Sequence, residues 1–136
     1  MKKAIGRITN PKSGAKVARS FHVEGEIFDL PKYNCHIWLA IEMRHGGITR
    51  LWPRTSELLL TEGRWSYHVE EHGSPPQEGF SLILLQINDD SNRLIKNLQR
   101  YSKMTGSHPG LRWFNISPDS NAGIYMLDRI DNLQLR

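Results

Sequence analysis

The chain has only one cysteine and no long apolar run, and these absences exclude several classes of protein. Cys35 is the one cysteine among 136 residues, so no intramolecular disulfide can form, and zinc sites built from several thiolates are excluded. No apolar run approaches the roughly 18 residues that span a bilayer. The basic start Met1-Lys2-Lys3 is followed by no apolar stretch, so it does not predict a secretory signal. We therefore expect a cytoplasmic protein, or an extracytoplasmic one if the sequence belongs to a longer chain.

Negative charge is missing from the beginning of the chain. Six basic residues precede the first acid, Glu24: Lys2, Lys3, Arg7, Lys12, Lys16 and Arg19. A basic arm of this kind can attract nucleic acid or anionic lipid, and its lysines can equally protect an edge strand from pairing with other chains. We favour the second interpretation because no aromatic residue interrupts the arm before Phe21.

The length and composition predict one domain, 1–136, with a basic N-terminal arm at 1–6 and a helix-containing insertion at about 89–110. A chain of this size buries roughly two-thirds of its surface on folding. Hydrophobic residues make up 38% and charged residues 24%, which is ordinary for a globular protein. A hydrophobic core is therefore sufficient, and we expect no structural metal and no cofactor.

Turn residues recur at short intervals, which predicts a mainly β protein. Strands are expected near 5–9, 20–28, 34–43, 48–53, 56–60, 64–70, 79–88, 111–116 and 123–134. The segments 35–41 and 80–85 are apolar on both faces, so we expect both faces of these central strands to be covered. In 64–69, the alternation places Trp65, Tyr67 and Val69 inward.

One segment has the periodicity of a helix. Its apolar residues share one face at 3.6 residues per turn: Leu94, Ile95, Leu98 and Tyr101. Asp90 or Ser91 is the expected N-cap, and Gly106 is expected to end the helix. We therefore predict an amphipathic helix near 90–103, and its apolar face is a candidate cover for the central strands.

Four short patterns follow one another along residues 7–88. They are the entry Ile8-Thr9-Asn10-Pro11 with Gly14 and Val17, the strand Phe21-His22-Val23-Glu24-Gly25, the apolar strand around Trp38, and the turn Gly63-Arg64-Trp65. In this order the chain resembles the immunoglobulin-like domains of bacterial multidomain and surface proteins. The resemblance implies a β-sandwich of about seven to nine strands in which the helix is an insertion. It also implies a spacer, ligand-binding or partner-docking role, although fold alone does not fix function.

No residue pattern in the sequence indicates catalysis. The nucleophile elbow, the phosphate-binding loop and the zinc-protease motif are all missing. Cys35 and His36 do not form a dyad, because neighbouring residues of a strand point to opposite faces. His45-Gly46-Gly47 faintly resembles an esterase oxyanion loop, but a hairpin turn is the better interpretation. We therefore expect no enzymatic activity.

The histidines show no spacing that is typical of metal ligands. The six are His22, His36, His45, His68, His72 and His108. None of them are paired at two residues on a strand or four on a helix, apart from His68 and His72, which flank a strand end and a turn. We expect no metal site, with a site assembled from distant strands as the alternative.

Two surfaces are candidates for binding. On the helix, Arg93, Lys96, Arg100 and Lys103 form one basic stripe opposite the apolar face, and no acidic residue occurs from Ser91 to Met104. A purely solubilising helix usually mixes the two signs. The other surface is Trp52 with Arg54, where Pro53 between them indicates an edge strand. Trp38 and Trp65 are expected to be buried, whereas Trp52 or Trp113 is a candidate for stacking on a sugar.

The leading functional interpretation is a non-enzymatic interaction or ligand-recognition module. Its partner is expected to be another protein or the rest of a longer chain. One alternative is an anion or nucleic-acid binder that uses the basic helix face, although nucleic acid is the less favoured ligand. A second alternative is a small-ligand or carbohydrate binder that uses an exposed tryptophan.

Overall fold

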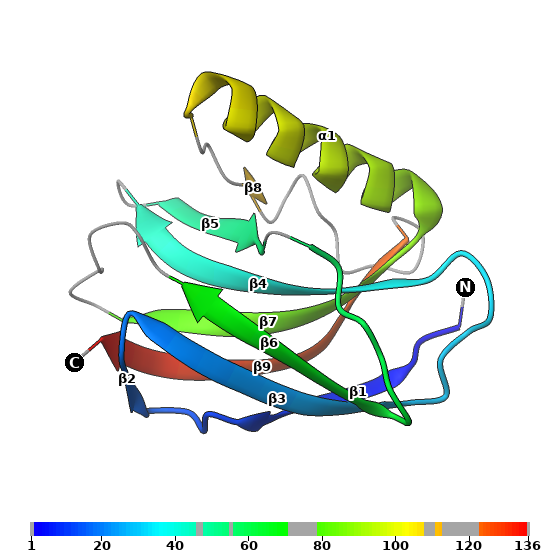
Figure 1. Ribbon diagram of the computed structural model, residues 1–136, viewed down its shortest axis with the longest axis horizontal. Coiled ribbons are helices and arrows are strands. Elements are labelled where there is room, and N and C mark those ends of the chain that lie inside the picture. Colours follow the sequence, from blue (N-terminus) through cyan, green and yellow to red (C-terminus); the bar gives the residue numbers. More distant parts are fainter. Residues whose placement is uncertain are drawn as a thin grey trace.

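The computed structural model describes residues 2–45, 48–54, 56–70, 79–107, 111–112 and 123–135. Within these residues the chain forms two β-sheets and one helix, arranged in three layers (Figure 1). The elements are β1 (Ile5–Asn10), β2 (Lys16–Val17), β3 (Ser20–Phe28), β4 (His36–His45), β5 (Ile48–Pro53), β6 (Arg64–Glu70), β7 (Phe80–Ile87), α1 (Asp89–Thr105), β8 (Leu111–Arg112) and β9 (Ile124–Leu135). The prediction of a mainly β protein with one helix is confirmed.

The two sheets have different sizes. The small sheet has the order β1-β3-β6, and the large sheet has the order β2-β9-β7-β4-β5-β8. All neighbouring strands are antiparallel except β2 and β9, which are parallel. The β3–β6 register runs over seven consecutive pairs without a shift, from Ser20 opposite Glu70 to Glu26 opposite Arg64.

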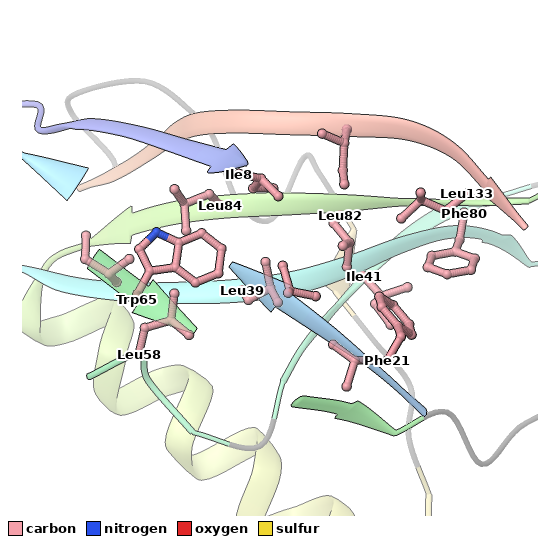
Figure 2. Packing of buried hydrophobic residues seen from close by; sticks show 14 of the residues in the cluster. Ile8, Phe21, Leu39, Ile41, Leu58, Trp65, Phe80, Leu82, Leu84 and Leu133 are labelled. Carbon is pink, nitrogen blue, oxygen red and sulfur yellow. The ribbon is translucent and has the colours of Figure 1, made fainter. Parts of the chain in front are cut away.

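The main core fills the space between the two sheets. Because side chains alternate along a strand, every second residue of β3, β4, β6 and β7 points into this space. Figure 2 shows Trp65 among aliphatic side chains from both sheets, with Leu58, Leu84 and Ile8 around it. Trp65 is 3% exposed, which agrees with its predicted inward position.

A second core lies on the other face of the large sheet, under α1. It contains Trp38, Leu51, Ile83, Leu85 and Ile87 from the sheet and Ile95 from the helix. In Figure 1, α1 extends along this face, on the side opposite the small sheet. The prediction that both faces of the central strands are covered, one of them by the helix, is therefore confirmed.

The basic arm is fixed by its backbone. Gln86 is fully buried, and its Oε1 accepts from the Ala4 amide at 2.6 Å while its Nε2 donates to the Lys2 carbonyl at 2.7 Å. Further along, a carboxylate oxygen of Asp128 accepts from the Ile8 amide at 2.8 Å. The side chains of Lys2 and Lys3 stay exposed. The arm is therefore held against the large sheet while its charges face solvent.

One predicted strand is wrong, one short strand was missed, and one prediction is tested only in part. The segment 56–60 is not a strand: its Leu58 amide donates to the Ile37 carbonyl and its side chain is buried, but Leu59 is 85% exposed. The two-residue strand β2 was not predicted. Within 111–116, only 111–112 is a described strand, and the remainder lies outside the described residues. β4 and β5 pair antiparallel as far as His45 opposite Ile48, and the predicted turn residues Gly46 and Gly47 lie outside the described residues.

Candidate functional site

Both ends of α1 are capped by local side-chain and backbone bonds. Asn88 is the N-cap, and its Oδ1 accepts from the Ser91 amide at 2.8 Å. At the other end, Gly106 has a φ of 73°, which glycine adopts without strain, and its amide donates to the Ser102 carbonyl. Gly106 was predicted as the end of the helix, whereas the predicted N-cap, Asp90 or Ser91, is wrong by two or three residues.

The buried face of α1 differs from the predicted one. Ile95 is buried as expected, but Leu94 is 63% exposed and Tyr101 is 52% exposed. Asn92 is buried instead, because its Oδ1 accepts from the Trp38 indole Nε1 at 2.8 Å. An indole N–H in an apolar layer needs an acceptor, and this requirement sets the rotation of the helix.

Replacing Asn92 tests this account of the helix rotation. We expect Asn92→Ala to lower the free energy of unfolding by about 1–3 kcal/mol, because the Trp38 N–H would stay buried without an acceptor. Asn97→Ala on the exposed face of the same helix is the matched control, and it should change stability by less than about 0.5 kcal/mol. Urea unfolding of both variants measures the difference. Equal effects would contradict the assigned role of Asn92.

A histidine with two carboxylate partners holds the first turn of α1 to the sheet. His36 lies at the start of β4, and its Nδ1 is 2.9 Å from a Glu57 carboxylate oxygen while its Nε2 is 2.7 Å from an Asp89 carboxylate oxygen. Lys96 of α1 reaches the other Glu57 oxygen at 3.6 Å. Nearby, the Asp89 amide donates to the Asn34 side chain at 2.7 Å. We call His36, Glu57, Asp89 and Lys96 the α1 clasp.

The clasp favours protonated His36. Burial of the ring opposes the positive charge, but the hydrogen bonds to Asp89 and Glu57 and the charges of both carboxylates outweigh it, so the pKa of His36 is raised. A proton is therefore bound more tightly in the folded state than in the unfolded state, where the pKa is about 6.5. This contribution to stability is complete below the unfolded pKa and is lost as pH rises through the folded pKa.

The pH dependence of stability tests the clasp. We expect the free energy of unfolding to fall by about 1 kcal/mol from His36 as pH increases from about 6 to about 9, a modest change because Asp89 is largely exposed to solvent. In His36→Gln this slope should flatten. Urea unfolding across that pH range, on wild type and variant in parallel, measures it. An unchanged slope in the variant would show that other groups cause the dependence.

The predicted basic stripe divides into two pairs. Arg93 forms an ion pair with Asp90 at 2.5 Å, and Lys96 belongs to the clasp. Arg100 and Lys103 are exposed and form no ion pair within the part of the chain that the structure describes. Among the described residues, the two basic residues near the N-terminal end of α1 are therefore held in ion pairs, whereas the two near its C-terminal end are not.

Apolar side chains share the exposed surface of α1 with these cations. Leu94, Tyr101 and Met104 are 63%, 52% and 80% exposed. We call Arg93, Leu94, Arg100, Tyr101, Lys103 and Met104 the outer face of α1. The exposed Leu94 and Met104 could not be found from helical periodicity, which places Leu94 inward and leaves Met104 outside the predicted stripe.

The other predicted binding pair, Trp52 and Arg54, does not join this surface. Both are half-buried, and the Arg54 Nη2 donates to the Trp52 carbonyl at 3.2 Å. Trp52 pairs with Ile41, whose side chain belongs to the core between the sheets, so Trp52 lies on the face of the large sheet opposite α1. The Gln99 side chain of α1 donates to the Arg54 carbonyl, which connects the helix to this segment.

The exposure of the tryptophans follows the predicted order. Trp38 is 0% exposed, Trp65 is 3% exposed, and Trp52 is half-buried. The predicted edge position is wrong in part, because β5 is flanked by β8 at Arg50 and Leu51. Trp113 lies outside the described residues. Trp38 and Trp65 are therefore closed to a stacking ligand, whereas Trp52 keeps part of its surface in contact with solvent.

Cys35 directly precedes β4, and its side chain and that of His36 contact different parts of the molecule. Cys35 packs against the core between the sheets, whereas His36 points toward the clasp. Burial and the nearby negative charge of Glu57 raise the pKa of the Cys35 thiol to about 11. The thiol is therefore protonated at neutral pH.

A second polar cluster lies where α1 does not cover the large sheet. Arg129 contacts Glu42 and Asp131, each at 2.9 Å, and the Ser81 hydroxyl donates to Asp131 at 2.7 Å. The hydrogen bonds from Arg129 and Ser81 lower the pKa of Asp131. Each charge here has a partner, so the cluster joins the neighbouring strands β4, β7 and β9.

No family model, curated protein or solved structure matches this chain. Among the described residues, no three histidine, cysteine or carboxylate side chains stand together as metal ligands. In the same part of the chain, no helix has the length and apolar character needed to span a membrane.

Proposed function

We propose that this protein is a non-enzymatic, immunoglobulin-like recognition module, and that the outer face of α1 binds an acidic surface of a partner protein. The observation that carries the proposal is the chemistry of that face. Arg100 and Lys103 have no ion-pair partner in the described part of the chain, and Leu94, Tyr101 and Met104 are exposed beside them.

The strand order supports the immunoglobulin-like assignment. In such domains, strands A, B and E form one sheet, and strands G, F, C and C′ form the other. The small sheet β1-β3-β6 and the run β9-β7-β4-β5 of the large sheet have this order. A variation is that the connection from β5 to β6 forms no further strand among its described residues.

The position of α1 supports a role in recognition. The helix lies between β7 and β9, the strands that correspond to F and G. In variable domains the F–G connection is one of the loops that contact ligands. Here that connection carries a helix that is fixed by the clasp and by the buried Trp38–Asn92 bond. A rigid helix presents its side chains with little loss of entropy on binding.

The mixed chemistry of the outer face favours a protein over a nucleic acid. Nucleic-acid binding proteins commonly neutralise several phosphates, about 6–10 in well-studied cases. The outer face offers two uncompensated cations, next to apolar side chains that a phosphate backbone would leave in water. An acidic protein surface with exposed apolar groups satisfies both kinds of side chain.

A charge reversal tests the proposal. The variant R100E/K103E should lose its partner in a pull-down from the native host, because attraction is replaced by repulsion. Lys96 is left unchanged, since its reversal would disturb the clasp. The matched control is K12E/K16E, which reverses two exposed lysines near β2, far from α1 (Figure 1). Both variants lower the formal net charge from +4 to zero.

The comparison between the two variants decides the outcome. We expect K12E/K16E to recover the same partner as wild type, and R100E/K103E to recover none. Binding by wild type should weaken as salt is raised, because exposed charges are screened. Equal recovery by all three proteins would mean that the outer face of α1 does not contribute to binding. Equal loss in both variants would mean that the net positive charge of the protein, and not this face, attracts the partner.

A further inference from the structure

Two histidines that are distant in sequence stand side by side on the small sheet. His22 of β3 lies directly opposite His68 of β6 in the antiparallel register. Their neighbours Phe21, Val23 and Val69 are buried, so both imidazoles project from the outer face of the sheet, where both residues are exposed. Directly opposed residues have Cβ atoms about 4.5–5.5 Å apart. A single ion can therefore reach both rings.

Each ring has an oxygen partner at its Nε2, and the two partners lie on opposite sides of the His22–His68 pair along the strands. The Nε2 of His22 is 3.3 Å from a Glu24 carboxylate oxygen, and the Nε2 of His68 is hydrogen-bonded to the Ser20 hydroxyl. Within the described ranges, neither Nδ1 has a hydrogen-bond or ion-pair partner. Histidines that bind metals usually donate their second ring N–H to a carboxylate or another oxygen, which fixes the ring. Each ring here has this outer partner.

From this geometry we propose that His22 and His68 together bind one divalent transition-metal ion through their Nδ1 atoms. Imidazole nitrogen favours Zn²⁺, Cu²⁺ and Ni²⁺ over Mg²⁺ and Ca²⁺, which prefer oxygen ligands. Metal–nitrogen bonds of about 2.0–2.1 Å fit between two directly opposed strand residues. With two protein ligands, the remaining coordination positions are open to water or to a group from another molecule.

The sheet around the pair is suited to hold this geometry. Seven consecutive pairs without a register shift join β3 to β6, and alternate residues of both strands are anchored in the core. The backbone therefore provides a rigid base for the two ligands, which raises affinity for an ion.

The site is independent of the proposed function, because it lies on the opposite side of the molecule from α1. Its test is calorimetric titration of metal-free protein with Zn²⁺ alone, in a buffer that does not chelate. We expect one equivalent to bind to wild type, with a raised thermal midpoint at saturation. His22→Ala and His68→Ala should each weaken binding at least tenfold, whereas the control His108→Ala should bind as wild type does.

Two further measurements test the role of Glu24 beside His22 and the competition of protons with Zn²⁺. Glu24→Gln should weaken Zn²⁺ binding about tenfold, as expected when the partner of a ligand is lost. Binding should also weaken at acidic pH, since protons compete for the ring nitrogens. Both truncated histidines are exposed, so the variants should melt like wild type without metal. Absence of binding in wild type, or full binding in His22→Ala or His68→Ala, would overturn the proposal.

Discussion

Trp65→Ala is expected to lower the free energy of unfolding by about 3–5 kcal/mol, the largest loss of any single side chain considered. Trp65 is 3% exposed and lies between the two sheets, where Leu58, Leu84 and Ile8 surround it (Figure 2). Removing the indole takes away apolar burial and leaves a cavity that the rigid sheets cannot close. Small domains have a total stability of about 5–15 kcal/mol, so this loss is a large share.

Trp52→Ala is the matched control for this prediction. The same atoms are removed, but Trp52 is half-buried at the border of the large sheet, where solvent can fill the space. Its cost should therefore be clearly smaller than that of Trp65→Ala. Urea unfolding of both variants gives the comparison. Equal costs would contradict the assignment of Trp65 to the centre of the core.

Gly25→Ala is expected to cost about 3 kcal/mol or slightly more, at the upper end of the usual range for overpacking. A Cβ at position 25 would lie 2.2 Å from the Arg7 carbonyl oxygen and 2.2 Å from Cζ2 of Trp65. The carbonyl belongs to the backbone of β1, which pairs with β3 at this point. The carbonyl can move only if that pairing is broken, so the added methyl group can be accommodated only at the cost of backbone hydrogen bonds between β1 and β3.

Gly6→Ala provides the contrast. Its Cβ would also be crowded, at 2.8 Å from Cδ2 of Leu84, but this obstacle is the end of a flexible side chain. We therefore expect Gly6→Ala to cost less than Gly25→Ala. In the Trp65→Ala background the ring is gone and the Arg7 carbonyl remains, so Gly25→Ala should still destabilise. A neutral effect there would show that the ring is the sole obstacle.

Strands with regular alternation could be located from the sequence. The segments 20–28, 48–53 and 64–70 were predicted with the bounds that the structure has, because in each case apolar and polar residues alternate or turn residues mark both ends. Leu58-Leu59-Leu60 was wrongly assigned to a strand. The run is apolar, but only Leu58 is buried, and the remainder crosses from the large sheet to the small one.

The candidate site depends on contacts between distant segments, which the sequence does not reveal. The basic residues of α1 were identified from their spacing, but the rotation of the helix was not, because it depends on a bond between Trp38 and Asn92, which are 54 positions apart. Glu57 was not identified as part of a site, because no motif marks it within the segment 56–60, which was predicted as a strand. The pairing of His22 with His68 follows from the β3–β6 register, which no local pattern encodes.

The most direct test of the account is to map the binding surface by nuclear magnetic resonance. The protein is labelled with ¹⁵N and titrated with the partner recovered in the pull-down. We predict that the largest amide shift changes fall on the outer face of α1, around Arg100, Tyr101 and Lys103, and that they are absent in R100E/K103E. The loop 29–35 is the rival surface, since Leu30 and Tyr33 are exposed there. Shift changes confined to that loop, with α1 unaffected, would contradict the account.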